Sequence, residues 1–335
     1  MTHKLSPTRR QLMIGAGAAA MAFSAGAGHA QSGDGAQIAL GGKSILITGS
    51  SSGFGRLGAE HYARLGAKVF ATMRNLPRPE ADELRQLAEA EGLDITVLEI
   101  DVTSDEQVET GVAAALEATG GTLDVLINNA GISYSGPIEV QDMEATRHMF
   151  ETNVFGPHRM ARAVLPAMRA AGSGQIFNVT SQLGRLIIPG FGQYSPTKFA
   201  LEAMSEQMAY ETVQHGIDVT IIQPGGYPTE IWKNAAMNSA ELKDRATESR
   251  LAAYPNMTAG MGDTSGGGGG STDPMDVPRA IAEIIAMAPG TRPLRRPVHP
   301  GAKPQVPVNE ISAQQQLAML GESGYGPLLR AVLER

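Results

Sequence analysis

Short apolar segments alternate with longer segments of helical periodicity along most of this chain. The apolar segments are rich in β-branched residues and lack apolar/polar alternation, so we expect strands that are buried on both faces. Strands and helices alternating at this spacing predict βαβ units, which fold into an α/β domain with a Rossmann-type doubly wound parallel sheet. The expected strands are 44–48, 67–73, 95–100, 123–128, 175–180 and 217–223, with a short last one near 293–298. The expected helices are one ending near 65 and others at 80–91, 104–118, 153–169, 194–215 and 275–288.

The totals exclude several classes of function. The 335 residues carry a formal net charge of -7, which gives no indication of a nucleic acid or an anionic membrane as partner. There are no cysteines, so disulfides, thiolate nucleophiles and thiolate metal sites are excluded. The seven histidines show no metal-ligand spacing, and we expect no metal site.

The first thirty residues have the composition of an export signal. A basic start that includes Arg9 and Arg10 precedes a short apolar run, which closes at Gly28-His29-Ala30 with small residues at the two positions that a signal peptidase reads. Residues 6–13 resemble a twin-arginine signal. The run is too short and too rich in glycine for a stable membrane-spanning helix.

We therefore expect residues 1–30 to be a signal peptide and 31–42 to be a linker, with the mature protein in the periplasm. The alternatives are an uncleaved anchor, or a leader that does not function and leaves the chain in the cytoplasm.

A glycine-rich loop directly follows the first expected strand and ends where a helix begins. It reads Thr48-Gly49-Ser50-Ser51-Ser52-Gly53-Phe54-Gly55. Glycines let the backbone approach a pyrophosphate, whose charge the helix N-terminus stabilises. The spacing is G-x-x-x-G-x-G rather than G-x-G-x-x-G, but the strand-loop-helix context is the one that supports a dinucleotide site. The residues expected to hold the cofactor here are Gly49, Ser51, Ser52, Gly53, Phe54 and Gly55.

The end of the second expected strand indicates which dinucleotide binds. An acid there would hold the ribose 2′-hydroxyl of NAD, whereas a base would hold the 2′-phosphate of NADP. No Asp or Glu occurs between Val69 and Pro79, and Arg74 lies at the right place. We expect NADP rather than NAD, with a solvated loop arginine as the alternative interpretation of Arg74.

Tyr194 and Lys198 form a Tyr-x-x-x-Lys pair, with Ser181 thirteen residues upstream of the tyrosine. On a helix, positions i and i+4 share one face. An ammonium one turn from a phenol favours the phenolate, so we expect Lys198 to lower the pKa of Tyr194 and make it a usable general acid/base. The pair alone recurs by chance, and its weight comes from the cofactor motifs elsewhere in the chain.

Taken together, these motifs resemble the short-chain dehydrogenase/reductase family, in its single-domain rather than extended branch. The residues that carry the resemblance are the 48–55 loop, Asn128-Asn129-Ala130-Gly131, Asn153, Ser181, Tyr194, Lys198 and Pro224-Gly225. The similarity covers about 42–300, and we place the domain at 43–300.

The resemblance implies a catalytic role for four residues. Tyr194 would pass a proton to or from the substrate oxygen, and Ser181 would hydrogen-bond that oxygen. Lys198 would bind the nicotinamide ribose, and Asn153 would hold a water that relays protons from Lys198 to solvent. Asn153 is also a candidate helix N-cap, and the two roles are compatible.

The other implied contacts are with the cofactor. Asp101, with Val102 beside it, would contact the adenine, although Asp101 is also a candidate cap for the next helix. Thr229 would meet the nicotinamide carboxamide. The remaining cofactor positions are Asn129, Ala130, Gly131, Pro224 and Gly225, although 128–131 is equally suited to bridging strands.

The region after Gly226 varies from the βαβ pattern. We expect 226–265, with Tyr227, Ile231 and Trp232, to cover the substrate, unless its apolar residues pack on the core instead. Residues 301–335 form a C-terminal tail with one or two short helices. The stretch 273–300 resembles hydroxysteroid- and retinol-dehydrogenase-like members, which implies an apolar alcohol or ketone as substrate. The resemblance also implies a homodimer or homotetramer.

The expected function is therefore NADP(H)-dependent hydride transfer between nicotinamide and an alcohol or ketone. Two alternatives use the same motifs. One is a sensor or scaffold that binds NADP(H) without turnover. The other is an epimerase or dehydratase that uses the Tyr194/Lys198 pair.

Overall fold

Seven parallel strands form one sheet in the computed structural model, which describes residues 38–263, 268 and 270–335. The strand order is β3-β2-β1-β4-β5-β6-β7, so the chain reverses its direction of progress between β1 and β4. Ligands of open parallel sheets bind at such a switch point, outside the carboxyl ends of the strands. The strands are β1 (Ser44–Ile47), β2 (Lys68–Met73), β3 (Ile95–Glu99), β4 (Val125–Asn128), β5 (Gly174–Val179), β6 (Ile217–Pro224) and β7 (Arg295–Val298).

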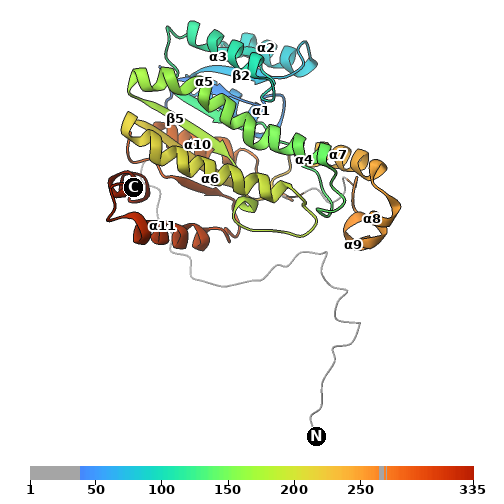
Figure 1. The fold of residues 1–335 in the computed structure, drawn as a ribbon. Coiled ribbons are helices and arrows are strands. Elements are labelled where there is room, and N and C mark those ends of the chain that lie inside the picture. Colours follow the sequence, from blue (N-terminus) through green and yellow to red (C-terminus); the bar gives the residue numbers. More distant parts are fainter. Residues whose placement is uncertain (1–37, 264–267, 269) are drawn as a thin grey trace. The chain divides into compact units, whose positions relative to one another are not determined.

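Helices cover both faces of the sheet (Figure 1). One core lies under α1 (Gly53–Arg64), α2 (Pro79–Glu91) and α10 (Asp276–Ala286), and it includes Ile45 and Ile47. The opposite core includes Leu46 and lies under α3 (Asp105–Glu117), α5 (Gly156–Ala171) and α6 (Tyr194–Thr212). Successive strand residues thus enter different cores, which is why the strands are apolar without alternation. The predicted fold class is confirmed.

The helix expected at 153–169 begins earlier than predicted. It starts as α4 (Met143–Phe150), passes through a π-helical turn (Glu151–Phe155) and continues as α5. Asp142 caps its start, since the Asp142 side chain accepts a hydrogen bond of 2.8 Å from the Ala145 amide. Asn153 therefore lies inside the helix, and its interpretation as an N-cap is wrong.

Both ends of the described chain pack against the sheet domain, and residues 38–335 form one compact unit. Leu40, in the range expected to be a linker, is 1% exposed, and its amide donates to the Leu65 carbonyl at 2.7 Å. The expected tail folds into α11 (Val306–Leu320) and α12 (Gly326–Leu333), and Leu329 and Val332 of α12 are buried. The tail thus belongs to the domain.

The region expected to cover the substrate is helical, as α7 (Ile231–Arg245), α8 (Glu248–Ala253) and α9 (Pro255–Thr258). The expected signal peptide lies outside the described residues. Among the described residues, no helix combines the length and the apolar character needed to cross a bilayer.

Candidate active site

One cavity of about 540 Å³ opens at the carboxyl edge of the sheet, where loops from β1 to β6 meet. It collects nearly every residue that the sequence predicts for the site. The predicted residues in its wall are Gly49, Ser51, Ser52, Gly53, Phe54, Arg74, Asp101, Val102, Asn129, Ala130, Gly131, Ser181, Tyr194, Lys198, Pro224, Gly225 and Thr229. Gly55 and Asn153 are the two predicted residues that are not in this wall.

The glycine loop is packed too closely for side chains at two positions. Gly49 has a φ of +71°, and a Cβ there would lie 2.9 Å from the Ala130 Cα. A Cβ on Gly55 would lie 2.2 Å from the Gly49 carbonyl oxygen and 2.6 Å from Nδ2 of Asn129. Gly55 therefore shapes the loop from behind, and the loop presents bare backbone to the cavity at the start of α1. This is the cradle that a pyrophosphate requires.

Asn129 ties this loop to the end of β4. Its side-chain amide donates to the carbonyl of Thr48 at 2.9 Å, and the Thr48 hydroxyl accepts from the amides of Asn129 and Ala130, both at 3.0 Å. The expected bridging of strands by this segment is therefore present. Because Asn129 and Ala130 also line the cavity, the same contacts position its wall.

Tyr194 begins α6, Lys198 follows one turn later, and Ser181 lies two residues beyond the end of β5. The Lys198 ammonium lies 5.7 Å from the centroid of the Tyr194 ring. It donates to the Val179 carbonyl at 3.0 Å, which fixes the lysine beneath the strand end. The Ser181 hydroxyl accepts from the Leu183 amide at 3.0 Å. The structure thus brings the three predicted side chains to one end of the cavity.

The expected effect of Lys198 on the tyrosine is not what the structure shows. Burial raises the pKa of Tyr194 to about 12, and a hydrogen bond with Ser181 offsets this only in part. Burial also lowers the pKa of Lys198 to about 8. Helical spacing places the two groups on one face, but desolvation of each charged form outweighs their interaction.

Asn153 lies behind the cavity wall with its side chain fully engaged. Its Oδ1 accepts from the Ile132 amide at 2.8 Å, and its Nδ2 donates to the Ile132 carbonyl at 2.9 Å and to the Thr197 hydroxyl at 3.1 Å. A Cβ on Gly131 would lie 3.4 Å from Asn153 Oδ1 and 3.6 Å from Lys198 Nζ, which places Asn153 near the lysine. Any water that Asn153 holds therefore needs its backbone carbonyl rather than its side chain.

Asp101 does not cap the helix that follows it. Its Oδ1 accepts from the amide of Thr103 at 2.9 Å, while the cap of α3 is Ser104, whose hydroxyl accepts from the Gln107 amide. Asp101 closes a tight turn, and both Asp101 and Val102 line the cavity. This position remains compatible with contact to an adenine.

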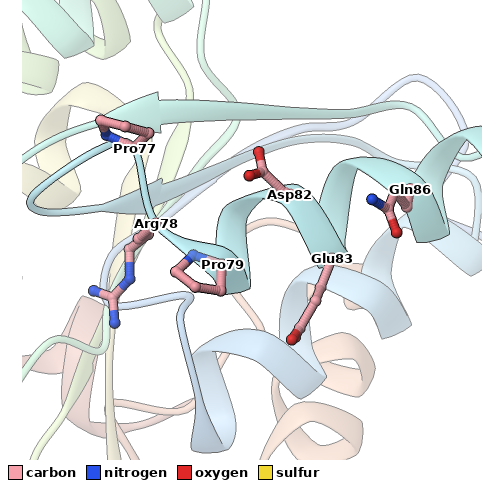
Figure 2. A pocket seen from close by; sticks show the side chains of 6 residues that line it. All are labelled: Pro77, Arg78, Pro79, Asp82, Glu83 and Gln86. Carbon is pink, nitrogen blue, oxygen red and sulfur yellow. The ribbon is translucent and has the colours of Figure 1, made fainter.

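Two arginines border the cavity beyond the end of β2. Arg74 is exposed, and its guanidinium has no ion pair within the described part of the chain. Arg78 is engaged, since it donates to both carboxylate oxygens of Glu80, at 2.9 and 3.0 Å, and lowers the pKa of Glu80 to about 2. Figure 2 shows Arg78 at a shallow surface hollow beside the start of α2, with its guanidinium directed away from Asp82.

The other end of the cavity is mainly apolar. Phe191 packs edge-to-face on Trp232 and is tilted against Tyr194, with 6.4 Å between ring centroids in both pairs. Thr229 lies against the glycine loop, 3.4 Å from the position of a Cβ on Gly53. Tyr227 packs edge-to-face on Phe54 at 5.5 Å. Of the residues expected to cover the substrate, Ile231 and Trp232 line the cavity, as does Tyr227, which also packs into a core.

Sequence reasoning missed several polar members of the wall, among them Arg78, His148 and Thr152. Arg78 lies in the same acid-free stretch as Arg74, so the sequence could have identified it as a second candidate phosphate contact. His148 and Thr152 lie on the part of the helix that was not predicted. Among the described residues, the buried Thr152 hydroxyl has no hydrogen-bond partner. His148 bonds the Tyr134 hydroxyl at 2.9 Å, and burial lowers its pKa.

Residues 43–240 match the family model described as short chain dehydrogenase. The chain belongs to the short-chain dehydrogenase/reductase family. It is 37% identical to an uncharacterised oxidoreductase, YusZ, of Bacillus subtilis, over 78% of this chain and 90% of the relative. It is 33% identical to human retinol dehydrogenase 8, over 76% of this chain and 80% of the relative.

Solved structures of short-chain dehydrogenases/reductases resemble this one. A protein from Burkholderia phymatum in complex with NAD is 25% identical, with a TM-score of 0.65, covering 84% of this chain and 95% of that one. A gluconate 5-dehydrogenase from Burkholderia cenocepacia in complex with NADP and tartrate is 30% identical, with a TM-score of 0.55, covering 62% and 80%. The family's oxidoreductases thus bind nicotinamide cofactors, and these structures do not distinguish NAD from NADP for this chain.

Proposed function

We propose that this protein is an NADP(H)-dependent oxidoreductase that interconverts an apolar ketone and its alcohol, with Tyr194 as general acid/base. The observation that carries the proposal is the single cavity in which the glycine loop and Arg74 lie at one end and Ser181, Tyr194 and Lys198 lie at the other. The bare loop at the start of α1 fits a dinucleotide.

NADP is favoured over NAD by the charge at the end of β2. Within the described ranges Arg74 is the cation there that has no ion pair, whereas Glu80 compensates Arg78. No acid in β2 or the loop after it competes for the ribose. A planar guanidinium suits bidentate contact with a phosphate. The cofactor, when bound, exchanges a hydride with the substrate carbon.

The chain's own residues then move the proton. Ser181 donates a hydrogen bond to the substrate oxygen, and Tyr194 transfers its phenolic proton to that oxygen as negative charge develops on it. Because burial raises the pKa of Tyr194 to about 12, the phenol holds its proton at neutral pH. The protonated form is the one that donates to a carbonyl oxygen, so Tyr194 is in the state that carbonyl reduction needs.

The substrate end of the cavity supports an uncharged, apolar compound. Its wall contains Leu183, Ile188, Phe191, Ile231, Trp232 and Met237. Among the described residues of this end, Lys198 is the one cation, and it lies behind Tyr194 on the Val179 carbonyl. A substrate carboxylate would therefore be desolvated without a partner, which is costly.

The test follows NADPH oxidation with pairs of ketones of equal length, one neutral and one ending in a carboxylate. We expect turnover of the neutral member. Tyr194→Phe should lower kcat by roughly 10²- to 10⁴-fold while NADPH still binds. Tyr210→Phe, a matched change on the same helix outside the cavity wall, should leave kcat unchanged. Near-normal turnover in Tyr194→Phe would refute the assignment.

We also propose export of this protein, which rests on the composition of residues 1–30. Mass spectrometry of the native protein would report the mature N-terminus and any nucleotide that is retained. If the native protein is found at full length in the cytoplasmic fraction, the proposed export is contradicted.

A further inference from the structure

Glu202 is a fully buried carboxylate one helical turn beyond Lys198 on α6. Its exposed fraction is 2%, and it is not part of the cavity wall. A carboxylate in such a place is costly unless it is fully paired and hydrogen-bonded. Three of its four partners, Thr180, Arg185 and Gln223, lie beside residues of the proposed active site, and the fourth, Arg295, lies on β7.

Oε1 of Glu202 joins the ends of β5 and β6. It accepts from the Thr180 hydroxyl at 2.8 Å and from the Gln223 side-chain amide at 2.8 Å. Thr180 directly precedes Ser181, and Gln223 directly precedes Pro224 in the cavity wall. One carboxylate oxygen therefore holds the backbone on both sides of the proposed reaction site.

Oε2 of Glu202 meets two arginines. It accepts from Nε of Arg295 on β7 at 2.9 Å and lies 3.4 Å from Nε of Arg185, in the segment that follows Ser181. That segment lies flush on α6, because a Cβ on Gly184 would come within 2.9 Å of Glu202 Cγ and 3.1 Å of the Lys198 carbonyl oxygen. Glu202 thus binds the helix of Tyr194 and Lys198 to the segment of Ser181.

We propose that Glu202 is a positioning residue for the reaction: it fixes Ser181 relative to Tyr194 and supplies, one turn along the helix, a negative charge that favours the ammonium form of Lys198. This inference rests on the proposed function for its catalytic meaning. It concerns a residue outside the cavity, which acts through Thr180 and Lys198 rather than by contact with substrate.

The charges around Glu202 determine what its removal does. Arg185 and Arg295 face it from the loop and from β7, and Lys198 and Glu206 flank it on α6. Glu206 is also paired with Arg295 and with the Tyr210 hydroxyl. Apart from Lys198, these groups are two arginines and two glutamates, whose charges cancel. Loss of the Glu202 charge therefore leaves an excess positive charge beside the Lys198 ammonium. Burial already lowers the pKa of Lys198 and Glu202 raises it, so removal lowers that pKa further.

Glu206 provides a matched control one turn further along the same helix. It is also buried and it shares both Arg185 and Arg295 with Glu202. Its hydrogen bonds go to Arg295 and Tyr210 rather than to Thr180 or Gln223. Glu206→Gln makes the same chemical change and disturbs the same ion-pair cluster. It leaves the contacts to the ends of β5 and β6 intact.

The experiment compares Glu202→Gln, Glu206→Gln and the unchanged protein in two measurements. The first is the pH dependence of kcat for ketone reduction with NADPH. In Glu202→Gln we expect kcat to fall by roughly 10- to 100-fold. We also expect the alkaline limb of the kcat profile, where Lys198 loses its proton, to move to lower pH by about one unit. In Glu206→Gln the limb should move much less.

The second measurement needs no turnover. Hydrogen-deuterium exchange of peptides covering 175–190 should be faster in Glu202→Gln than in Glu206→Gln, since only the former weakens the hydrogen bond from Thr180 by removing the charge of its acceptor. Should Glu202→Gln fail to fold, Thr180→Val tests the same bond with the carboxylate kept. It should lower kcat and speed exchange without moving the alkaline limb.

The outcomes separate the two proposals. If the unchanged protein reduces no ketone but exchange differs as expected, the proposed function fails and the positioning of the Ser181 segment stands. If Glu202→Gln and Glu206→Gln show the same pH profile and the same exchange, Glu202 is merely structural and this inference is overturned. Thr180→Val with normal kcat and exchange would overturn it as well.

Discussion

Replacing Lys198 with methionine should change how the stability of the chain depends on pH. Burial lowers the pKa of Lys198 from 10.5 to about 8 in the folded protein. Between pH 8 and pH 10.5 the unfolded chain therefore binds more protons than the folded one, and the free energy of unfolding rises with pH through that window. At about 1.4 kcal/mol per pKa unit, the rise amounts to about 3 kcal/mol.

Lys198→Met lacks this rise. The variant also loses the hydrogen bond to the Val179 carbonyl, but that loss does not depend on pH. The stability difference between the two proteins should thus move by about 3 kcal/mol in favour of the lysine between pH 7.5 and pH 10.5. Titration of the tyrosines occurs in both proteins and cancels in the difference.

The assay is urea unfolding without added cofactor, followed by fluorescence at several pH values across that window. Lys233→Met is the control, because the Lys233 side chain is 67% exposed in its pair with Glu230. Its curve should run parallel to that of the unchanged protein. If the Lys198→Met curve is parallel too, Lys198 is not desolvated in solution and the argument about the acid/base pair fails.

Three further substitutions test separate parts of the molecule. Arg74→Ala should weaken NADPH binding roughly 10- to 150-fold and leave NADH binding unchanged, because a hydrogen bond to a charged group contributes about 1.5–3 kcal/mol; equal losses in fluorescence titrations with both nucleotides would contradict the NADP assignment. Gly55→Ala should destabilise the fold by about 1–3 kcal/mol or more in urea unfolding, since its Cβ would overlap the Gly49 carbonyl oxygen at 2.2 Å. Asp218→Asn should cost about 3–5 kcal/mol, because it breaks a buried pair with Arg292 at 2.8 Å, and an unchanged melting temperature would refute this. The kcat of the Asp218 variant should stay the same.

The fold was open to prediction because burial of the strands leaves a direct trace in the sequence. Ile45, Leu46 and Ile47 are all apolar because adjacent residues enter cores on opposite faces of the sheet. The glycine loop was equally readable, since a contact of 2.2 Å behind Gly55 admits no side chain. In both cases the type of residue at a position follows from how closely that position is packed.

The helix start at Met143 was missed for a different reason. Asp142 provides an ordinary N-cap, but the π-helical turn at Glu151–Phe155 shifts the apolar face and interrupts the 3.6-residue period. Only the second half of the helix was therefore recognised. The loss matters for function, because the missed half carries His148 and Thr152 into the cavity wall.

The protonation states of Tyr194 and Lys198 could not be predicted from the sequence, because residue spacing fixes their geometry but not how deeply each group is buried. Tyr194 and Lys198 share a helical face as predicted, yet burial pushes the pKa of Tyr194 up to about 12 and that of Lys198 down to about 8. Burial shifts both pKa values toward the neutral forms, so at neutral pH a protonated phenol faces an ammonium rather than a phenolate. The charges that affect the pKa of Lys198 also depend on groups that are distant in sequence. Glu202 is the buried carboxylate that opposes the loss of the Lys198 proton, and it is itself held by Arg295, which lies 93 residues away. A Tyr-x-x-x-Lys pattern therefore locates the proton donor, whereas the ion pairs behind the helix determine the pH range in which it works.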